Sequence, residues 1–165
     1  MKTLNILSLL FLGLASCDPN CGDWEFYKDE KCIKIIDSTH TFAEALSACQ
    51  KLEKTSIPLT IHSPEEQNFM TELIFRKNGV HDTVWLGAHL GADKQFHWAD
   101  EAEGKFTNWA PGEPSHKPVA SCIQMMPEPL HVGKWSDEPC DKKNLVVCQR
   151  LQSWTLQHMQ QVSVE

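Results

Sequence analysis

Seven cysteines in a chain of 165 residues constrain its fold more than any other feature. They are Cys17, Cys21, Cys32, Cys49, Cys122, Cys140 and Cys148. Cys17 lies at the end of a segment that resembles a leader peptide. If Cys17 is removed with that segment, six cysteines remain. An even number suits three disulfides in an oxidising compartment. If Cys17 stays in the mature chain, it is a spare thiol that can pair with another molecule.

The first 17 residues have the pattern of a secretory signal peptide. Lys2 supplies the positive charge, residues 6–12 are apolar, and small residues follow at Gly13, Ala15 and Ser16. Cleavage after Ser16 keeps Cys17, whereas cleavage after Cys17 removes it. Residues 14–17 also match a bacterial lipoprotein box, which we favour less. The apolar run is too short to span a membrane, so we expect a secreted, extracellular protein without a transmembrane segment.

The net charge of −7 restricts the partners that the chain can attract. An acidic chain without a basic stripe is a poor ligand for nucleic acid and for anionic membranes. The motifs GxSxG and HExxH and the glycine-rich phosphate loop are absent from the sequence. We therefore expect a binding protein that is not an enzyme.

Two helices are predicted from their start signals. Thr41 and Glu44 form a capping box, and Ser63 with Pro64 and Glu66 forms a second start. The first helix has one apolar face, made of Phe42, Ala45, Leu46, Cys49 and Leu52. The inward stripe of the second is made of Phe69, Met70, Leu73 and Ile74, and Asn78–Gly79 ends that helix.

The remaining patterns are typical of strands. A hairpin is expected at residues 25–27 and 31–36, where Cys21 and Cys32 can bridge the two arms. Further strands are expected at residues 83–88, 95–98, 121–126 and 144–149. A hairpin, two helices and then strands predict an α+β domain over residues 21–150. The tail at 151–165 carries no cap or cysteine and is expected to be flexible.

The segment from Trp109 to Cys140 is rich in proline and turn formers, yet it carries two tryptophans and two cysteines. Ordering each backbone residue costs about 1–2 kcal/mol, so such a loop needs a cross-link or buried rings to hold it. Loops held by a rigid scaffold often carry binding sites. We therefore expect the functional residues in this segment.

The order of these motifs resembles the C-type lectin-like domain family. The motifs that carry the resemblance are the cysteines, Trp85-Leu86-Gly87, Glu113-Pro114-Ser115 and Trp135-Ser136-Asp137. The resemblance covers about residues 21–150. It implies two helices with small antiparallel sheets and a long disulfide-pinned loop. The implied disulfides are Cys21–Cys32, Cys49–Cys148 and Cys122–Cys140. The first of these is typical of the long form of the domain.

The resemblance also implies a calcium ion that grips sugar hydroxyls in the long loop. Of the five ligand positions, Glu113 and Asp137 keep their carboxylates. Ser115 and Ser136 replace asparagines, and Ala120 replaces a glutamate. Since calcium prefers six to eight oxygens with several carboxylates, we expect a millimolar calcium site or none.

Two functions follow from this resemblance. In the first, the chain is a carbohydrate-recognition domain, with Glu113, Ser115, Ser136 and Asp137 lining the sugar site. Trp109 is a further candidate there, for stacking on a sugar ring. In the second, the same fold binds an extracellular protein without calcium. The fold alone does not choose between them.

Histidines and tryptophans in this region have more ordinary interpretations. The histidines His89, His97, His116 and His131 are zinc ligands by type, but no pair has a tight ligand spacing. Scattered surface histidines are therefore the favoured interpretation. The other tryptophans of the region, Trp85, Trp98 and Trp135, are expected to be core residues.

Overall fold

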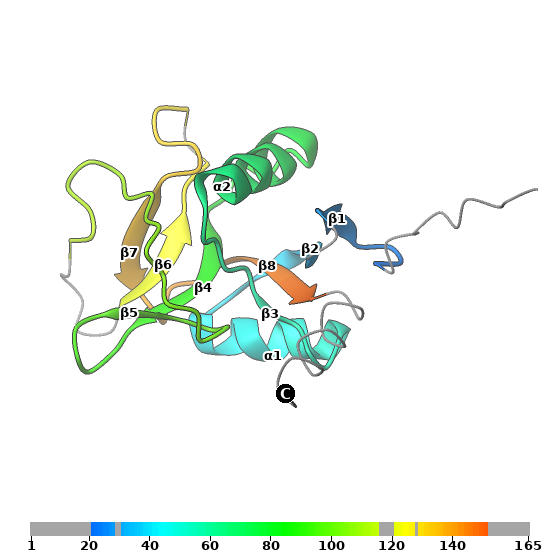
Figure 1. Ribbon diagram of the computed structural model, residues 1–165, viewed down its shortest axis with the longest axis horizontal. Coiled ribbons are helices and arrows are strands. Elements are labelled where there is room, and N and C mark those ends of the chain that lie inside the picture. The colour runs from blue at the N-terminus through cyan, green and yellow to red at the C-terminus, as the bar shows by residue number, and fades with distance from the viewer. Residues whose placement is uncertain (1–20, 29–30, 116–120, 128, 152–165) are drawn as a thin grey trace, which may run out of the picture.

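The computed structural model describes residues 21–28, 31–115, 121–127 and 129–151 (Figure 1). The predicted signal peptide, Cys17, His116, Ala120 and residues 152–165 of the tail lie outside this part of the chain.

Eight strands and two helices make up the described structure. The strands are β1 (Glu25–Tyr27), β2 (Lys31–His40), β3 (Ile57–Pro58), β4 (Val84–Leu90), β5 (Phe96–Trp98), β6 (Ser121–Met125), β7 (Trp135–Pro139) and β8 (Asn144–Leu151). The helices are α1 (Phe42–Leu52) and α2 (Pro64–Thr71), and a π-helical segment, η1 (Glu72–Lys77), continues α2. Figure 1 shows the strands running between the two helices. The α+β class and the two helices are therefore confirmed.

All eight strands belong to one sheet with the order β1-β2-β8-β4-β6-β7, while β3 pairs with β8 and β5 with β4. The β4–β8 pair is parallel and the other pairs are antiparallel. The strands thus form one mixed sheet in place of several small antiparallel ones. Strands β3 and β7 were not predicted from the sequence, because a two-residue strand has no pattern and because β7 is polar and ends in proline.

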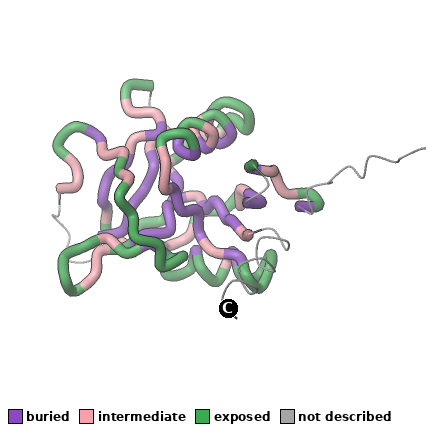
Figure 2. The backbone as a smooth tube through the Cα atoms, viewed as in Figure 1, coloured by how far each residue is buried: buried purple, intermediate pink, exposed green. Residues whose placement is uncertain are grey.

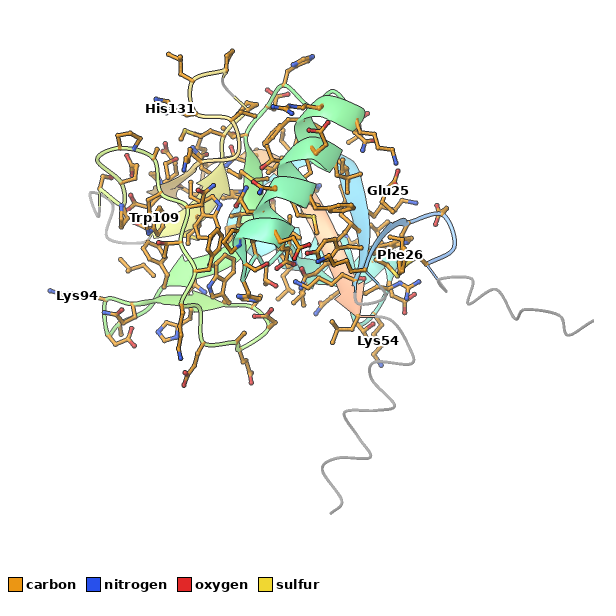
Figure 3. The ribbon with its side chains drawn as sticks, turned by 45° about the horizontal axis from the view of Figure 1, so that its top comes forward. Glu25, Phe26, Lys54, Lys94, Trp109 and His131 are labelled. Carbon is orange, nitrogen blue, oxygen red and sulfur yellow. A yellow bond between two sulfur atoms is a disulfide. The ribbon has the colours of Figure 1, made fainter. Side chains whose placement is uncertain are left out.

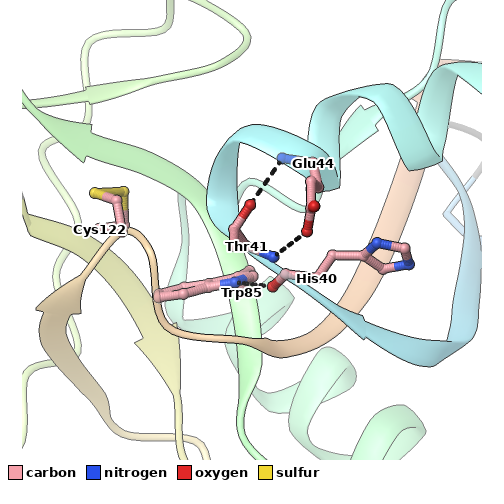
Figure 4. The surroundings of a disulfide bond; sticks show 6 residues. His40, Thr41, Glu44, Trp85 and Cys122 are labelled. Carbon is pink, nitrogen blue, oxygen red and sulfur yellow. Dashed lines mark hydrogen bonds between the residues drawn. A yellow bond between two sulfur atoms is a disulfide. The ribbon is translucent and has the colours of Figure 1, made fainter.

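Both predicted helix starts are present. The Thr41 side chain accepts from the Glu44 N–H, and the Glu44 carboxylate accepts from the Thr41 N–H (Figure 4). Ser63 caps α2 by accepting from the Glu66 N–H. Among the described residues, neither helix is long and apolar enough to cross a bilayer.

The inward face of α1 is narrower than the sequence predicts. Ala45 and Cys49 are fully buried, but Leu46 and Leu52 are 41% and 45% exposed. The helix packs on the sheet through small residues, and its Cys49–Cys148 disulfide joins it directly to β8. The two leucines therefore lie outside the core.

The core follows the purple segments of Figure 2, which run through the central strands and the inner side of α2. Trp85, Leu86 and Trp135 are fully buried, and Trp98 is only 7% exposed. The Trp85 indole donates to the His40 carbonyl, which fixes β4 against the end of β2 (Figure 4). The remaining disulfides are Cys21–Cys32 and Cys122–Cys140, so all three pairs are those implied by the resemblance.

Candidate functional site

The segment before the EPS tripeptide is fixed to β7 by main-chain hydrogen bonds. The Ala110 N–H donates to the Trp135 carbonyl, and the Trp135 N–H donates to the Asn108 carbonyl. The Glu113 N–H in turn donates to the Ala110 carbonyl. The Glu113–Pro114 peptide bond is cis. This local structure carries Glu113 and Ser115 to the side of β7.

Glu113, Ser115 and Asp137 meet at that point. The Ser115 N–H donates to Asp137 Oδ1 at 2.5 Å and to Glu113 Oε2 at 3.0 Å. The Ser115 hydroxyl also donates to Asp137 Oδ1, at 3.0 Å. The Asp137 N–H lies 3.5 Å from Glu113 Oε2. Chain donors thus engage Glu113 Oε2 and Asp137 Oδ1.

These two carboxyl groups affect each other's titration. Burial and the neighbouring Asp137 carboxylate raise the pKa of Glu113. Burial also opposes ionisation of Asp137, but hydrogen bonds from Glu113 and Ser115 outweigh it and lower the pKa of Asp137. The two carboxyl groups therefore titrate as a pair and not as independent groups.

Ser136 points to the other face of β7, because successive side chains of a strand alternate. Its hydroxyl accepts from Gln124 Nε2 on β6 at 3.0 Å. The Gln124 carbonyl oxygen accepts from Lys142 Nζ at 3.1 Å and from Asn144 Nδ2 at 2.9 Å. Glu138 lies on the same face, with its carboxylate 3.7 Å from Lys142 Nζ. A polar network thus covers this face of the β6–β7 pair.

A recess of about 580 Å³ opens over this network, and we call it the polar recess. Its lining includes Glu113, Gln124, Ser136, Glu138 and Lys142, together with His81, Asp82 and His131. Figure 3 labels His131 on the loop that connects β6 and β7. Glu113 is the residue that belongs both to the polar recess and to the cluster with Asp137.

The other sequence candidates lie elsewhere. Trp109 is half-buried and packs on Phe96 and Trp135, with ring centroids 5.2 and 5.8 Å apart (Figure 3). It does not line the polar recess. His89 and His97 lie together on β4 and β5, and the His97 ring bonds to the Asp93 carboxylate. The described residues contain no group of three histidines, cysteines or carboxylates placed to hold a metal.

Calcium fits this donor set poorly. The two carboxylates face chain N–H and O–H donors, and the Ser136 hydroxyl is held by the Gln124 amide. Among the described residues, those that would hold calcium are Glu113 and Asp137, while the Ser115 and Ser136 hydroxyls are already hydrogen-bonded within the chain.

Comparison with known proteins identifies the family. The model of the Lectin C-type domain matches residues 38–150. The chain belongs to the C-type lectin domain family. Its domains are non-enzymatic binding modules.

Two sequence relatives and one structure illustrate the family. The human low affinity immunoglobulin epsilon Fc receptor is 34% identical over 128 residues, which is 76% of this chain and 36% of the receptor. This chain therefore spans about a third of the receptor's length. A lectin from Pleurodeles waltl is 29% identical over 88% of this chain and 87% of its own.

The structural relative is the carbohydrate-recognition domain of CD23 from cow, crystallised in the presence of a GlcNAc2Man3 oligosaccharide. It is 30% identical, with a TM-score of 0.67 over 79% of this chain and 94% of that domain.

Sequence reasoning missed the polar network of this C-type lectin domain. Gln124 is 3% exposed and stands between Ile123 and Met125, so it is a polar residue within a buried apolar strand. Because a buried amide needs hydrogen-bond partners, a glutamine within an apolar strand is a sequence signal of such a network. Lys142 carries no comparable signal, because an isolated lysine in a turn is ordinary.

Proposed function

We propose that this chain is an extracellular carbohydrate-recognition domain that binds a glycan in the polar recess and depends only weakly on calcium. The single observation that supports it most is the recess itself, which joins Glu113 and Ser136 of the family's site to a network of amide, ammonium and carboxylate groups. The oligosaccharide present with the related cow domain supports a sugar as the ligand.

The lining suits sugar hydroxyls, each of which donates one hydrogen bond and accepts others. Glu113 and Glu138 offer carboxylate acceptors, and Lys142 offers ammonium donors. Gln124 and Asn144 hold these groups in place, because the Gln124 carbonyl accepts from both Lys142 and Asn144. Because these side chains are already held in place, ligand binding loses little further side-chain entropy.

Calcium has a minor role in this proposal. Only Glu113 and Asp137 remain of the family's carboxylate ligands, while Ala120 and the two serines contribute little. We expect a dissociation constant in the millimolar range or no binding, as in the weakest extracellular calcium sites.

A glycan array tests the proposal, read in calcium and again in a chelator. The expected result is binding that mostly persists in the chelator and is lost in Glu113→Gln and Lys142→Ala. Lys54→Ala is the matched control, because Lys54 is an exposed lysine in the turn after α1 and does not line the recess (Figure 3). No signal on any glycan in either buffer, from a folded protein, would refute glycan recognition.

The alternative is a protein ligand bound without calcium. Leu130 favours it, because this side chain is 88% exposed beside His131, which lines the recess. An exposed apolar side chain next to a recess offers apolar surface that a protein partner can bury. Binding of an extracellular protein that is insensitive to competing glycans, and lost in Leu130→Ser, would select this alternative.

A further inference from the structure

A second pocket, lined by aromatic rings, lies on the opposite face of the β6–β7 pair from the polar recess. Its volume is about 290 Å³. Five of its lining residues are aromatic, and we call it the aromatic pocket: Phe96, Trp98, Phe106, Trp109 and Trp135. The register places Ile123 opposite Asp137 and Gln124 opposite Ser136. Trp135 and Ile123 therefore face the aromatic pocket, whereas Ser136 and Gln124 face the recess.

The floor of the aromatic pocket is rigid. Trp135 is fully buried, and its indole N–H donates to Gln67 Oε1 on α2 at 2.7 Å. Three rings meet the Trp135 ring nearly at right angles, at centroid distances of 5.5 to 5.8 Å: those of Trp98, Phe106 and Trp109. Such edge-to-face packing fixes the rings relative to one another.

The walls and the mouth have different chemistry. Phe96, Phe106 and Trp109 are half-buried, so each keeps some ring surface open. Gln95 and Thr107 line the same pocket and are exposed, which places polar groups at its mouth. Aromatic rings therefore line the pocket, and exposed hydrogen-bonding side chains lie at its edge.

We propose that the aromatic pocket binds one pyranose residue of a glycan by ring stacking, without calcium. A pyranose has an apolar C–H face and a polar hydroxyl rim, which match the ring walls and the mouth. Pockets for drug-sized ligands have volumes of about 300–1,000 Å³, so this pocket is suited to a single sugar ring.

The two sites meet at adjacent residues, since Glu113 lines the polar recess and Pro114 lines the aromatic pocket. The choice of a sugar as the occupant rests on the proposed function, whereas the pocket and its chemistry do not. Binding in the aromatic pocket needs neither the Glu113 carboxylate nor a metal.

Titration with methyl glycosides of mannose, galactose and N-acetylglucosamine tests this inference, with chelator present. The readout is the set of tryptophan indole N–H signals in a ¹⁵N–¹H spectrum. Trp98 and Trp109 are expected to shift with a millimolar dissociation constant for at least one glycoside. Trp85, which donates to the His40 carbonyl and does not line the pocket, is the internal control.

Three variants locate the binding. Trp109→Leu keeps an apolar side chain and is expected to weaken binding by roughly threefold to tenfold, the value of one aromatic contact. Thr107→Val, at the exposed mouth, serves if Trp109→Leu fails to fold, and is also expected to weaken binding. Glu113→Gln is expected to leave the indole shifts unchanged.

The outcomes separate the two proposals. If glycosides shift the indole signals but no array signal depends on Glu113, the aromatic pocket is supported as a glycan site. The same result rejects the polar recess as a glycan site. Array binding lost in Glu113→Gln, with no shift of Trp98 or Trp109, rejects the aromatic pocket. Shifts caused by phenylalanine amide but by no glycoside would also overturn it, because the pocket would then take an apolar side chain.

Discussion

At the scale of single residues, hydrogen bonds to carboxylates decide what the site can do. Asp137 receives the main-chain and hydroxyl donors of Ser115, and its pKa falls despite burial. Glu113 is the partner whose pKa rises. The same pair that the family uses for metal binding is therefore held here by chain donors.

Opposite changes in stability are expected when each charge of this pair is removed. Asp137→Asn loses charge-assisted hydrogen bonds and should lower the free energy of unfolding by about 1–3 kcal/mol. Glu113→Gln removes a carboxylate whose ionisation is opposed by burial and by Asp137, and should raise the free energy of unfolding at pH 7 by less than about 1 kcal/mol, because solvent screens this partly exposed group. Urea unfolding in chelator measures both. Equal destabilisation by the two changes would contradict this account.

Asp100 gives a second residue-scale test, outside the site. Partial burial opposes its ionisation, but hydrogen bonds from His62 and Thr60 lower its pKa from 3.8 to about 2. A depressed carboxyl pKa stabilises the folded state above the unfolded value and loses that effect as the pH falls.

Asp100→Asn should therefore cost about 1–2 kcal/mol at pH 7, after discounting for solvent screening. The difference from the unmodified chain should shrink between pH 4 and pH 2. A difference that stays constant over this range would show that Asp100 acts only through packing.

At the scale of elements, strand alternation separates the two candidate sites. The face of β6 and β7 that carries Gln124 and Ser136 lines the polar recess, and the face that carries Ile123 and Trp135 lines the aromatic pocket. One hairpin thus supports both surfaces, while the Cys122–Cys140 disulfide joins its two ends.

Gly87 controls how closely β4 approaches β3. A Cβ atom at this position would lie 2.6 Å from the Pro58 carbonyl oxygen, which is main chain and cannot rotate away. The Gly87 N–H also donates to the Leu59 carbonyl. Gly87→Ala should therefore lower the free energy of unfolding by about 1–3 kcal/mol, as overpacking does. Thermal unfolding measures it, and an unchanged Tm would show that β3 can shift.

Elements with strong local signals were predictable from the sequence, and the contacts of the site were not. Thr41 and Ser63 mark helix starts because a cap is a contact between near neighbours in the chain. The Lys142–Gln124 and Trp135–Gln67 contacts join residues 18 and 68 positions apart, so only the folded sheet brings them together. Leu46 was misplaced because helical periodicity shows a face but not its width.

At the scale of the whole molecule, the disulfides close loops of very different lengths. Cys49–Cys148 spans 99 positions, Cys122–Cys140 spans 18 and Cys21–Cys32 spans 11. In the chain-entropy model, a longer loop gives a larger loss of unfolded-state entropy.

Removing each pair by double substitution to alanine should therefore destabilise the domain in order of loop length. The expected losses are about 4–5 kcal/mol for Cys49–Cys148 and about 3 kcal/mol for each of the other two. Guanidinium unfolding compares them. A larger loss for Cys21–Cys32 than for Cys49–Cys148 would show that native contacts outweigh chain entropy.

The central claim is that the chain's own side chains, with at most a weak calcium ion, form the recognition surface. Calorimetric titration of the refolded, metal-free domain with calcium tests it most directly. The account predicts a millimolar dissociation constant or no heat of binding. A submillimolar dissociation constant that is lost in Glu113→Gln would contradict it.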